Sequence, residues 1–225
     1  MGIGLVGVLL LLPLLTSAQE RESPRQSGWT ELFNGGNLEG WETIGEGVWI
    51  VMRGGTLLGQ CDPRRPFLEQ AWLYTRREFV EFDLQLEYWM PLGGNSGISI
   101  RDTSRGRYAV AGPEHDSKRN PSHVGYEIQL GSSTSQRYEF GVSGSVYLLH
   151  GAKPGVQRDG DWNTLGIESR NDLILVRING EVVSQHPGLP ERSKTGPIGL
   201  QLHNKNTIVM FRNIRLRALE SRKNP

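Results

Sequence analysis

The chain has 225 residues, and its 25 Lys and Arg side chains nearly balance 24 Asp and Glu, which leaves a formal net charge of +1. This balance creates no strong positive field, so we do not expect the protein to bind nucleic acid. The single cysteine, Cys61, excludes an internal disulfide, and burial of apolar side chains must therefore hold the fold together.

An apolar run over residues 1–15 opens the chain and is followed by Thr16-Ser17-Ala18. The run is shorter than the roughly 20 apolar residues of a membrane helix, and the small residues after it fit cleavage behind Ala18. We therefore predict a signal peptide over residues 1–18, export to the periplasm or the extracellular space, and no membrane span in the mature chain. Because no Lys or Arg precedes the run, a retained anchor is the alternative.

Residues 19–28 are polar and predict a flexible leader. Beyond them, short runs of β-branched and aromatic residues alternate with clusters of Gly, Pro, Asn and Asp, a pattern typical of strands joined by turns. In chain order, the predicted strands are Val48–Met52, Thr56–Gln60, Ala71–Thr75, Phe79–Met90, Ser96–Asp102, Gly125–Leu130, Ser145–Leu149, Asn163–Ser169, Asp172–Ile178, Glu181–His186, Ile198–His203 and Thr207–Leu219. The Ser- and Gly-rich stretch Gly131–Ser145 is expected to be a loop, and residues 220–225 a polar tail.

Two turn signals divide these strands. Asn179-Gly180 is the strongest hairpin signal in the chain, because both central positions of a type I′ turn need positive φ. Arg53-Gly54-Gly55 marks a similar reversal. No helical periodicity lasts for three turns past the signal peptide, and twelve strands at this length favour two antiparallel sheets packed as a sandwich. We predict a single all-β jelly-roll domain over residues 29–219.

Polar residues alternate with apolar ones in three of the predicted strands, and side chains two apart share a face. The polar positions are Asn95, Ser99 and Arg101, then Glu127 and Gln129, and last Gln201 and His203. If these strands lie in one sheet, a single surface carries an acid, a base and a guanidinium. For each residue taken alone, a solvated surface position is the alternative interpretation.

Other polar and aromatic residues leave their roles open. Trp89 ends the charged face of the Phe79–Met90 strand, where it could stack on a sugar or cover a sheet edge. Glu114, His115, Asp116 and His123 lie in one loop and could ligate a divalent metal, although the solubility of a loop explains them as well. The sequence has no Gly-x-Ser-x-Gly elbow, His-Glu-x-x-His motif, P-loop or Gly-x-Gly-x-x-Gly fingerprint.

An ordered series of motifs resembles the 3-keto-disaccharide hydrolase domain family over about Trp29 to Leu219. The motifs are Trp29-Thr-Glu-Leu-Phe-Asn34 with Leu38-Glu-Gly-Trp41, Gly94-Asn-Ser-Gly-Ile-Ser-Ile-Arg101, Gly125-Tyr-Glu-Ile-Gln129, Asp161-Trp-Asn163, Val176-Arg-Ile-Asn-Gly180, Gly196-Pro-Ile-Gly-Leu-Gln-Leu-His203 and Phe211-Arg-Asn-Ile214. The family commonly carries an Asp two residues after the third motif, where this chain has Leu130-Gly131-Ser132. The loop Thr103–Val124 belongs to this chain alone, so substrate specificity is not carried over.

The resemblance implies a concanavalin A-like lectin/glucanase jelly roll that cleaves sugars already oxidised at C3. A C3 ketone acidifies the C2 proton, so cleavage can run by proton abstraction, elimination and addition of water, with a base, an enolate-stabilising group and an acid. The resemblance then makes Glu127 and His203 the base or a metal ligand and Arg101 the oxyanion partner. The substrate-binding residues would be Asn95, Gln129, Gln201 and Trp89.

Further expectations and two rival functions accompany this reading. A divalent metal is a candidate cofactor, and a separate oxidoreductase would have to supply the keto-sugar, because nothing in this chain binds a nicotinamide. A non-catalytic, lectin-like carbohydrate-binding module is the main alternative, since amides, carboxylates and aromatic platforms also bind plain sugars. A structural domain of a surface assembly is the third reading, and it is favoured if the polar residues are dispersed.

Overall fold

The computed structural model describes residues 1–2, 28–61 and 69–219. Nearly all of the predicted signal peptide and leader, and the whole of the polar tail, lie outside these described residues. The strands are β1 (Trp29–Glu31), β2 (Trp41–Ile44), β3 (Gly47–Met52), β4 (Thr56–Cys61), β5 (Ala71–Thr75), β6 (Phe82–Trp89), β7 (Asn95–Ile100), β8 (Tyr126–Gly131), β9 (Trp162–Arg170), β10 (Leu173–Ile178), β11 (Glu181–His186), β12 (Ile198–Leu202) and β13 (Ile208–Ala218). Three short helices accompany them, η1 (Arg107–Ala109), α1 (Pro121–Val124) and η2 (Ser133–Arg137).

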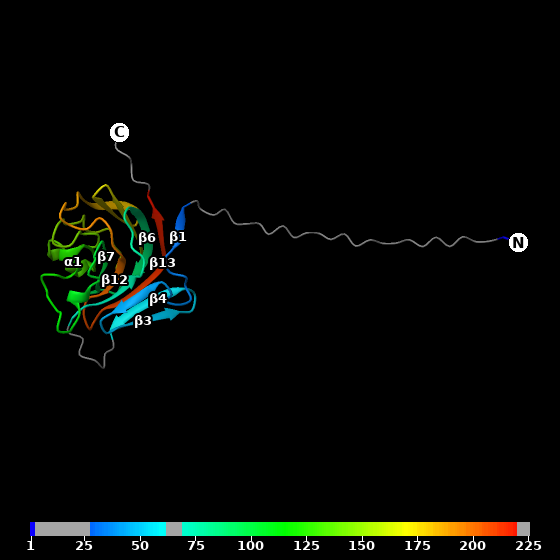
Figure 1. Cartoon of the computed structure of the whole chain (residues 1–225), viewed down its shortest axis with the longest axis horizontal. Coiled ribbons are helices and arrows are strands. Elements are labelled where there is room, and N and C mark those ends of the chain that lie inside the picture. Colours follow the sequence, from blue (N-terminus) through cyan, green and yellow to red (C-terminus); the bar gives the residue numbers. More distant parts are fainter. Residues whose placement is uncertain (3–27, 62–68, 220–225) are drawn as a thin grey trace, which may run out of the picture.

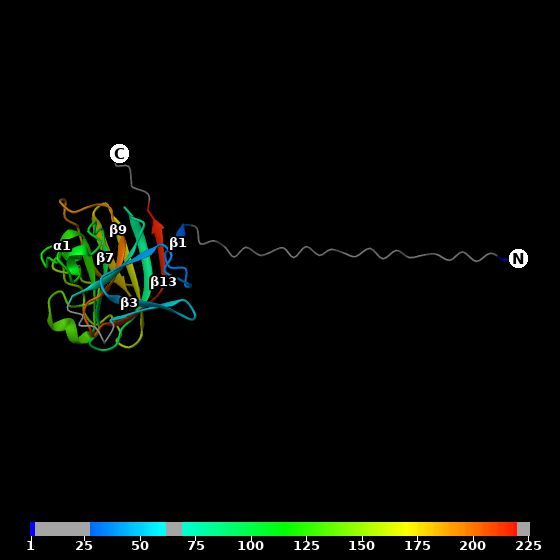
Figure 2. The same cartoon turned by 60° about the horizontal axis from the view of Figure 1, so that its bottom comes forward.

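Two antiparallel sheets form a sandwich (Figure 1). One is eight-stranded, in the order β11-β10-β9-β6-β13-β4-β3, with β1 also paired to β13. The other is five-stranded, in the order β2-β5-β12-β7-β8. Some neighbours come from distant parts of the chain, as where β13 lies between β4 and β6, and Figure 2 shows β1 and β13 side by side. This arrangement is the predicted jelly-roll sandwich with a concanavalin A-like fold.

The core lies between the sheets and follows the predicted alternation. Phe82, Leu84, Leu86 and Tyr88 of β6 are buried, while the residues between them are partly exposed. The same period of two buries the apolar positions of β12, β7 and β8 against them. Burial of apolar surface contributes about 25 cal/mol per Å², so this continuous core supplies most of the stabilisation in a chain that cannot form an internal disulfide.

Both predicted reversals are confirmed. Asn179 and Gly180 join β10 to β11 with φ angles of 51° and 82°, the positive values that a type I′ turn requires. Gly54 and Gly55, between β3 and β4, have φ angles of 89° and 79°. These turns fix the register of both hairpins.

The strand predictions differ from the structure at three places. The first two strands, β1 and β2, were not predicted, because each has only three or four residues. The predicted strand Ser145–Leu149 is not a regular strand; within it, Val146 forms isolated bridges to Ile128 and to His150.

None of the helices in the described ranges has the length or apolar character of a membrane span.

Candidate functional site

Strands β12, β7 and β8 are consecutive neighbours in the five-stranded sheet. Their polar positions therefore lie on one outer face, as the alternation predicts. Within this face, Glu127 of β8 lies opposite Ser99 of β7. Continuing the β12–β7 register places Gln201 opposite Gly97. The candidate site is the outer surface that the polar side chains of β12, β7 and β8 form.

Glu127 is the central titratable group of this surface. Its side chain is buried, and its Oε1 accepts a hydrogen bond of 2.8 Å from Nε2 of Gln201. Burial raises the pKa of the Glu127 carboxyl to about 7, although the hydrogen bond from Gln201 acts in the opposite direction. The negative charge of Asp102 adds to the rise. Glu127 can therefore gain or lose a proton near neutral pH.

Glycines make room for the polar groups on the sheet. A Cβ atom at Gly97 would lie 2.9 Å from Oε1 of Glu127 and 3.2 Å from Oε1 of Gln201. A Cβ atom at Gly199 would collide with the ring of Tyr74. Because glycine has no side chain, Glu127 and Gln201 can reach across β7 and meet above Gly97.

Gln201 has one unsatisfied side-chain atom. The residue is fully buried, and within the described residues its Oε1 has no hydrogen-bond partner while its Nε2 is bound to Glu127. A buried acceptor without a partner costs roughly 1–3 kcal/mol. The side-chain carbonyl of Gln201 is therefore, among the described residues, an acceptor without a partner, and it is buried beneath the surface.

The β5 side of the surface is closed. Trp72 and Tyr74 are fully buried, and their rings stack with centroids 5.6 Å apart. The Tyr74 hydroxyl donates to Asp102 at 2.8 Å, and Asp102 also accepts from the backbone N–H of Gly106 at 2.7 Å. Burial and the charge of Asp102 raise the pKa of the Tyr74 phenol. Sequence reasoning missed Trp72 and Tyr74, although their alternation with Ala71 and Leu73 places them on this face.

The opposite side of the surface opens into a pocket of about 510 Å³. Its floor carries Gln129 and Asn95, which are joined by a hydrogen bond of 2.9 Å from Gln129 Nε2 to Asn95 Oδ1. Its walls come from Tyr147 and from the segment 135–141. Gln129 follows Glu127 by two residues on the same face of β8, so the pocket adjoins the position of Glu127, which does not itself line it.

The segment 142–147 forms the rim of this pocket by pairing with β8. Gln129 donates its backbone N–H to Ser145 at 2.9 Å, and Tyr147 donates its backbone N–H to the carbonyl of Glu127 at 2.8 Å. Burial and the charge of Glu127 raise the pKa of the Tyr147 phenol. The predicted loop Gly131–Ser145, together with Tyr147, is thus the element that shapes the pocket.

His203 follows β12 directly and is half-buried. Continuing the β12–β7 register places it opposite Asn95, two positions beyond Gln201. Burial lowers the pKa of its imidazole, which therefore favours the neutral form at pH 7. The structure thus brings together Glu127, Gln129, Gln201 and Asn95 on one face, and His203 follows Gln201 by two residues, just past the end of β12.

Arg101 does not join this group. Its φ of 57° breaks the alternation at the end of β7, and its side chain is buried. Its Nη1 lies 3.8 Å from Asp172 Oδ1. Burial lowers the pKa of the guanidinium, while Tyr126, Asp172 and Glu81 act in the opposite direction. Because Tyr126 belongs to the core, the predicted placement of Arg101 on the outer face is wrong.

Trp89 is also separate from the group. It ends β6 in the eight-stranded sheet, where it pairs with Trp162 and Met210. The expectation that it shares a surface with Glu127 is therefore wrong, because period two within β6 could not show which sheet that strand would join.

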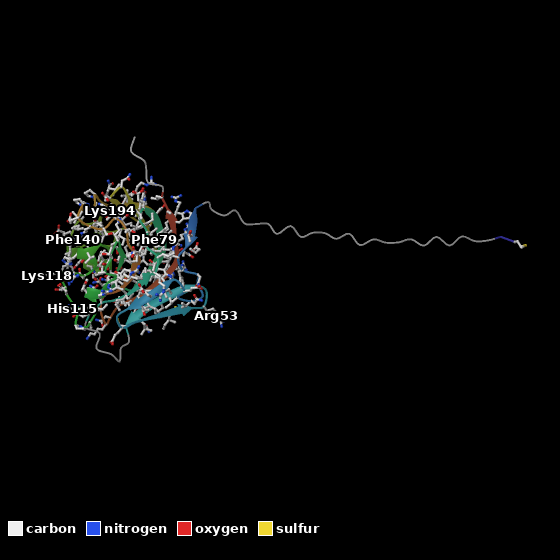
Figure 3. The ribbon with its side chains drawn as sticks, viewed as in Figure 1. Arg53, Phe79, His115, Lys118, Phe140 and Lys194 are labelled. Carbon is white, nitrogen blue, oxygen red and sulfur yellow. The ribbon has the colours of Figure 1, made fainter. Side chains whose placement is uncertain are left out.

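The acidic and imidazole residues of the loop 103–124 do not converge. Among the residues that the structure describes, no group of three or more His, Cys, Asp and Glu side chains could hold a metal ion. His115 lies 3.8 Å from a carboxylate oxygen of Glu69, and His123 contacts Asn120 instead. Figure 3 shows His115 and Lys118 at the edge of the molecule.

Several known structures resemble this chain in fold. A proposed glycosyl hydrolase from Parabacteroides distasonis has a TM-score of 0.65 and 26% identity, and the match covers 85% of this chain and 99% of that one. A second proposed glycosyl hydrolase from the same organism has a TM-score of 0.66 and 20% identity, over 86% and 95%. The carbohydrate-binding module CBM66 from Bacillus subtilis has a TM-score of 0.52 and 14% identity, over 80% and 96%.

Among curated proteins, no sequence matches this chain. The family model of the 3-keto-alpha-glucoside-1,2-lyase-like domain matches residues 28–217. This range contains every strand of both sheets except the end of β13, as well as every residue of the candidate site. The chain therefore belongs to the 3-keto-alpha-glucoside-1,2-lyase-like domain family, which the ordered motifs of its sequence predict.

Proposed function

We propose that this protein cleaves 3-keto-glycosides by elimination, with Glu127 as the base that removes the C2 proton. One observation carries the proposal: burial brings the pKa of the Glu127 carboxyl to about 7, on the outer face beside a pocket. A general base works best when its pKa lies near the working pH. Membership of the family and the resemblance to a proposed glycosyl hydrolase at 26% identity support the same substrate class.

The reaction begins at the carbon next to the ketone. The C2–H bond breaks, the proton moves to a carboxylate oxygen of Glu127, and the electron pair forms the enolate of the C3 ketone. The enolate then restores the ketone as a C1–C2 double bond forms and the C1–O bond breaks, and the departing oxygen takes a proton. Addition of water across the double bond completes the hydrolysis.

The neighbouring side chains suit the positions around this base. Gln201 holds the Glu127 carboxylate by donating from its amide nitrogen, and the amides of Gln129 and Asn95 line the adjacent floor. His203 lies just past the end of β12, and we assign it the relay of the C2 proton from Glu127 to the departing oxygen, because a neutral imidazole can accept a proton at one nitrogen and donate from the other. Arg101 has no part in this proposal, because its guanidinium lies beside Asp172.

Export and the supply of substrate complete the proposal. The apolar run of residues 1–15, followed by Thr16-Ser17-Ala18, supports a periplasmic or extracellular protein. The reaction needs a ketone at C3, so a separate oxidoreductase must oxidise the sugar before this protein acts on it. Carbohydrate is accordingly the ligand of the site.

The test is release of a chromogenic leaving group from a 3-keto-glucoside by the mature protein, with and without EDTA. We expect release that is lost in Glu127→Gln and in His203→Ala and retained in Glu87→Gln, a carboxylate of the other sheet. Loss of release with EDTA would add a divalent metal to the mechanism. Retained activity in both site variants would refute the site, and no release with calorimetric binding of plain oligosaccharides would make the protein a lectin-like module.

A further inference from the structure

We propose that the pocket beside Glu127 is the leaving-group subsite, where the flat face of a ring attached at C1 stacks on Tyr138 and Phe140. The shared chemistry is a ring with a π or C–H face, which an aryl group and a second sugar both provide. This inference rests on the proposed function and specifies which part of the substrate the segment 135–141 selects.

Aromatic side chains form the outer walls of the pocket. Tyr138, Phe140 and Tyr147 all line it, and the rings of Phe140 and Tyr147 meet edge to face with centroids 6.4 Å apart. Tyr138 is 58% exposed, and the guanidinium of Arg137 lies 5.0 Å from its ring centroid. Figure 3 shows Phe140 on the side of the molecule that carries α1 in Figure 1. The pocket is thus polar on its floor and aromatic at its mouth.

The closed side of the site fixes the direction in which a substrate enters. Trp72 and Tyr74 fill the face toward β5, and Gly106 packs on the ring of Trp72. Glu127 is only 4% exposed, and Gln129, two residues further along its strand, is the nearest residue of this face to line the pocket. A keto-sugar must therefore come through the pocket with C2 innermost, and its C1 substituent then extends outward to Phe140 and Tyr138.

The segment that carries the rings is held in place. A Cβ atom at Gly131 would collide with the carbonyl of Gly141, and one at Gly141 would collide with the carbonyl of Ser135. Ser133 donates its backbone N–H to Asp159 at 2.9 Å. Because the two glycines allow this close approach, the pocket wall is built before a ligand arrives, which lowers the entropic cost of binding.

The experiment compares three 3-keto-glucosides whose C1 substituents are methyl, phenyl and glucosyl. For Tyr138→Leu and Phe140→Leu, kcat/KM is divided by the value of the unaltered protein with the same substrate, which removes differences in leaving-group reactivity. We expect up to about a tenfold loss with the phenyl or the glucosyl substrate and less than a twofold change with the methyl substrate. The substrate with the larger loss of kcat/KM shows whether the subsite prefers an aryl ring or a second sugar.

A matched control comes from another loop. Tyr108 is also a partly exposed tyrosine with an arginine over its ring, Arg119 at 3.6 Å, and Tyr108→Leu should leave all three ratios near one. Equal losses with the methyl substrate, or no loss with either ring, would overturn the subsite while leaving the proposed function intact. If the unaltered protein turns over none of the three compounds, the proposed function itself fails, and the subsite fails with it.

Discussion

On the outer face of the eight-stranded sheet, carboxylates are paired with arginines across neighbouring strands. On the outer face of the five-stranded sheet, Glu127 is paired with an amide. Glu87 lies 2.6 Å from Nη2 of Arg212, and Asp83 lies 2.9 Å from Nη2 of Arg217. Both arginines are about 40% exposed, so these charges are partly solvated as well as neutralised.

The arrangements on the two faces differ in their contribution to the free energy of unfolding. A solvated ion pair changes the free energy of unfolding little, because water and the opposite charge both stabilise each ionised group. A buried carboxylate with only an amide beside it is destabilised in its ionised form. Such a cost is typical of a functional position, which is why we locate the reaction on the five-stranded sheet although the other face also contains a pocket, of about 420 Å³.

The strongest test of this contrast replaces one carboxylate on each face. Glu127→Gln should lower kcat at least about a hundredfold, because a general base contributes 10²- to 10⁴-fold, while Glu87→Gln should leave kcat unchanged. In the unaltered protein, kcat/KM should rise with pH through about 7 as Glu127 loses its proton. A pH profile that stays flat between pH 5 and 8, or equal activity of the two variants, would remove Glu127 from the chemistry.

Glycine substitutions sharpen the comparison further. Gly199→Ala forces a Cβ atom into the ring of Tyr74 and should destabilise the fold by about 1–3 kcal/mol. Gly97→Ala meets the flexible ends of Glu127 and Gln201, so it should fold but lose most of its activity. Gly166→Ala is the control on the other sheet, where the nearest atom to the new Cβ is 3.6 Å away. Urea unfolding and turnover of all three variants measure these effects.

The pH dependence of the free energy of unfolding tests the raised pKa of Glu127. An unfolded Glu loses its proton near 4.5, whereas Glu127 in the fold loses it near 7. Between these values the folded state holds the extra proton, so the contribution of Glu127 to the free energy of unfolding falls as pH rises, by up to about 3 kcal/mol. Glu127→Gln should therefore become more stable than the unaltered protein as pH rises from 5 to 8. A constant difference across that range would contradict the raised pKa.

Much of this face could be predicted from sequence because one rule governs it. Period-two alternation identified Asn95, Glu127, Gln129 and Gln201 from the apolar residues between them, and the ordered motifs indicated the family. The rule fails where the backbone leaves the strand, and the residue pattern gave no sign that Arg101 has a positive φ. Trp89 shows a second limit, because the pairing of strands far apart in sequence is decided by the packing of the whole sandwich.

The structure of the pocket wall could not be predicted from the sequence, for a related reason. The stretch 131–145 has no periodicity, and its shape depends on contacts such as that between Gly131 and Gly141. Hydrogen bonds to the edge of β8 then bring Tyr147 beside Glu127. The Ser- and Gly-rich composition of this loop therefore did not predict its ordered structure, whereas the alternation in the surrounding strands predicted them directly.

The smallest expected effect comes from breaking a pair on the eight-stranded sheet. Arg212 contacts Glu87 at 2.6 Å and lies 4.0 Å from the ring centroid of Trp162. Because the arginine is 38% exposed, Arg212→Ala should cost only about 1 kcal/mol, and part of that cost should vanish in high salt. Turnover should be unchanged, because the proposed reaction uses no residue of this face. Thermal unfolding at low and high salt measures the first effect, and a loss of turnover without unfolding would mean that the charged face also contributes to function.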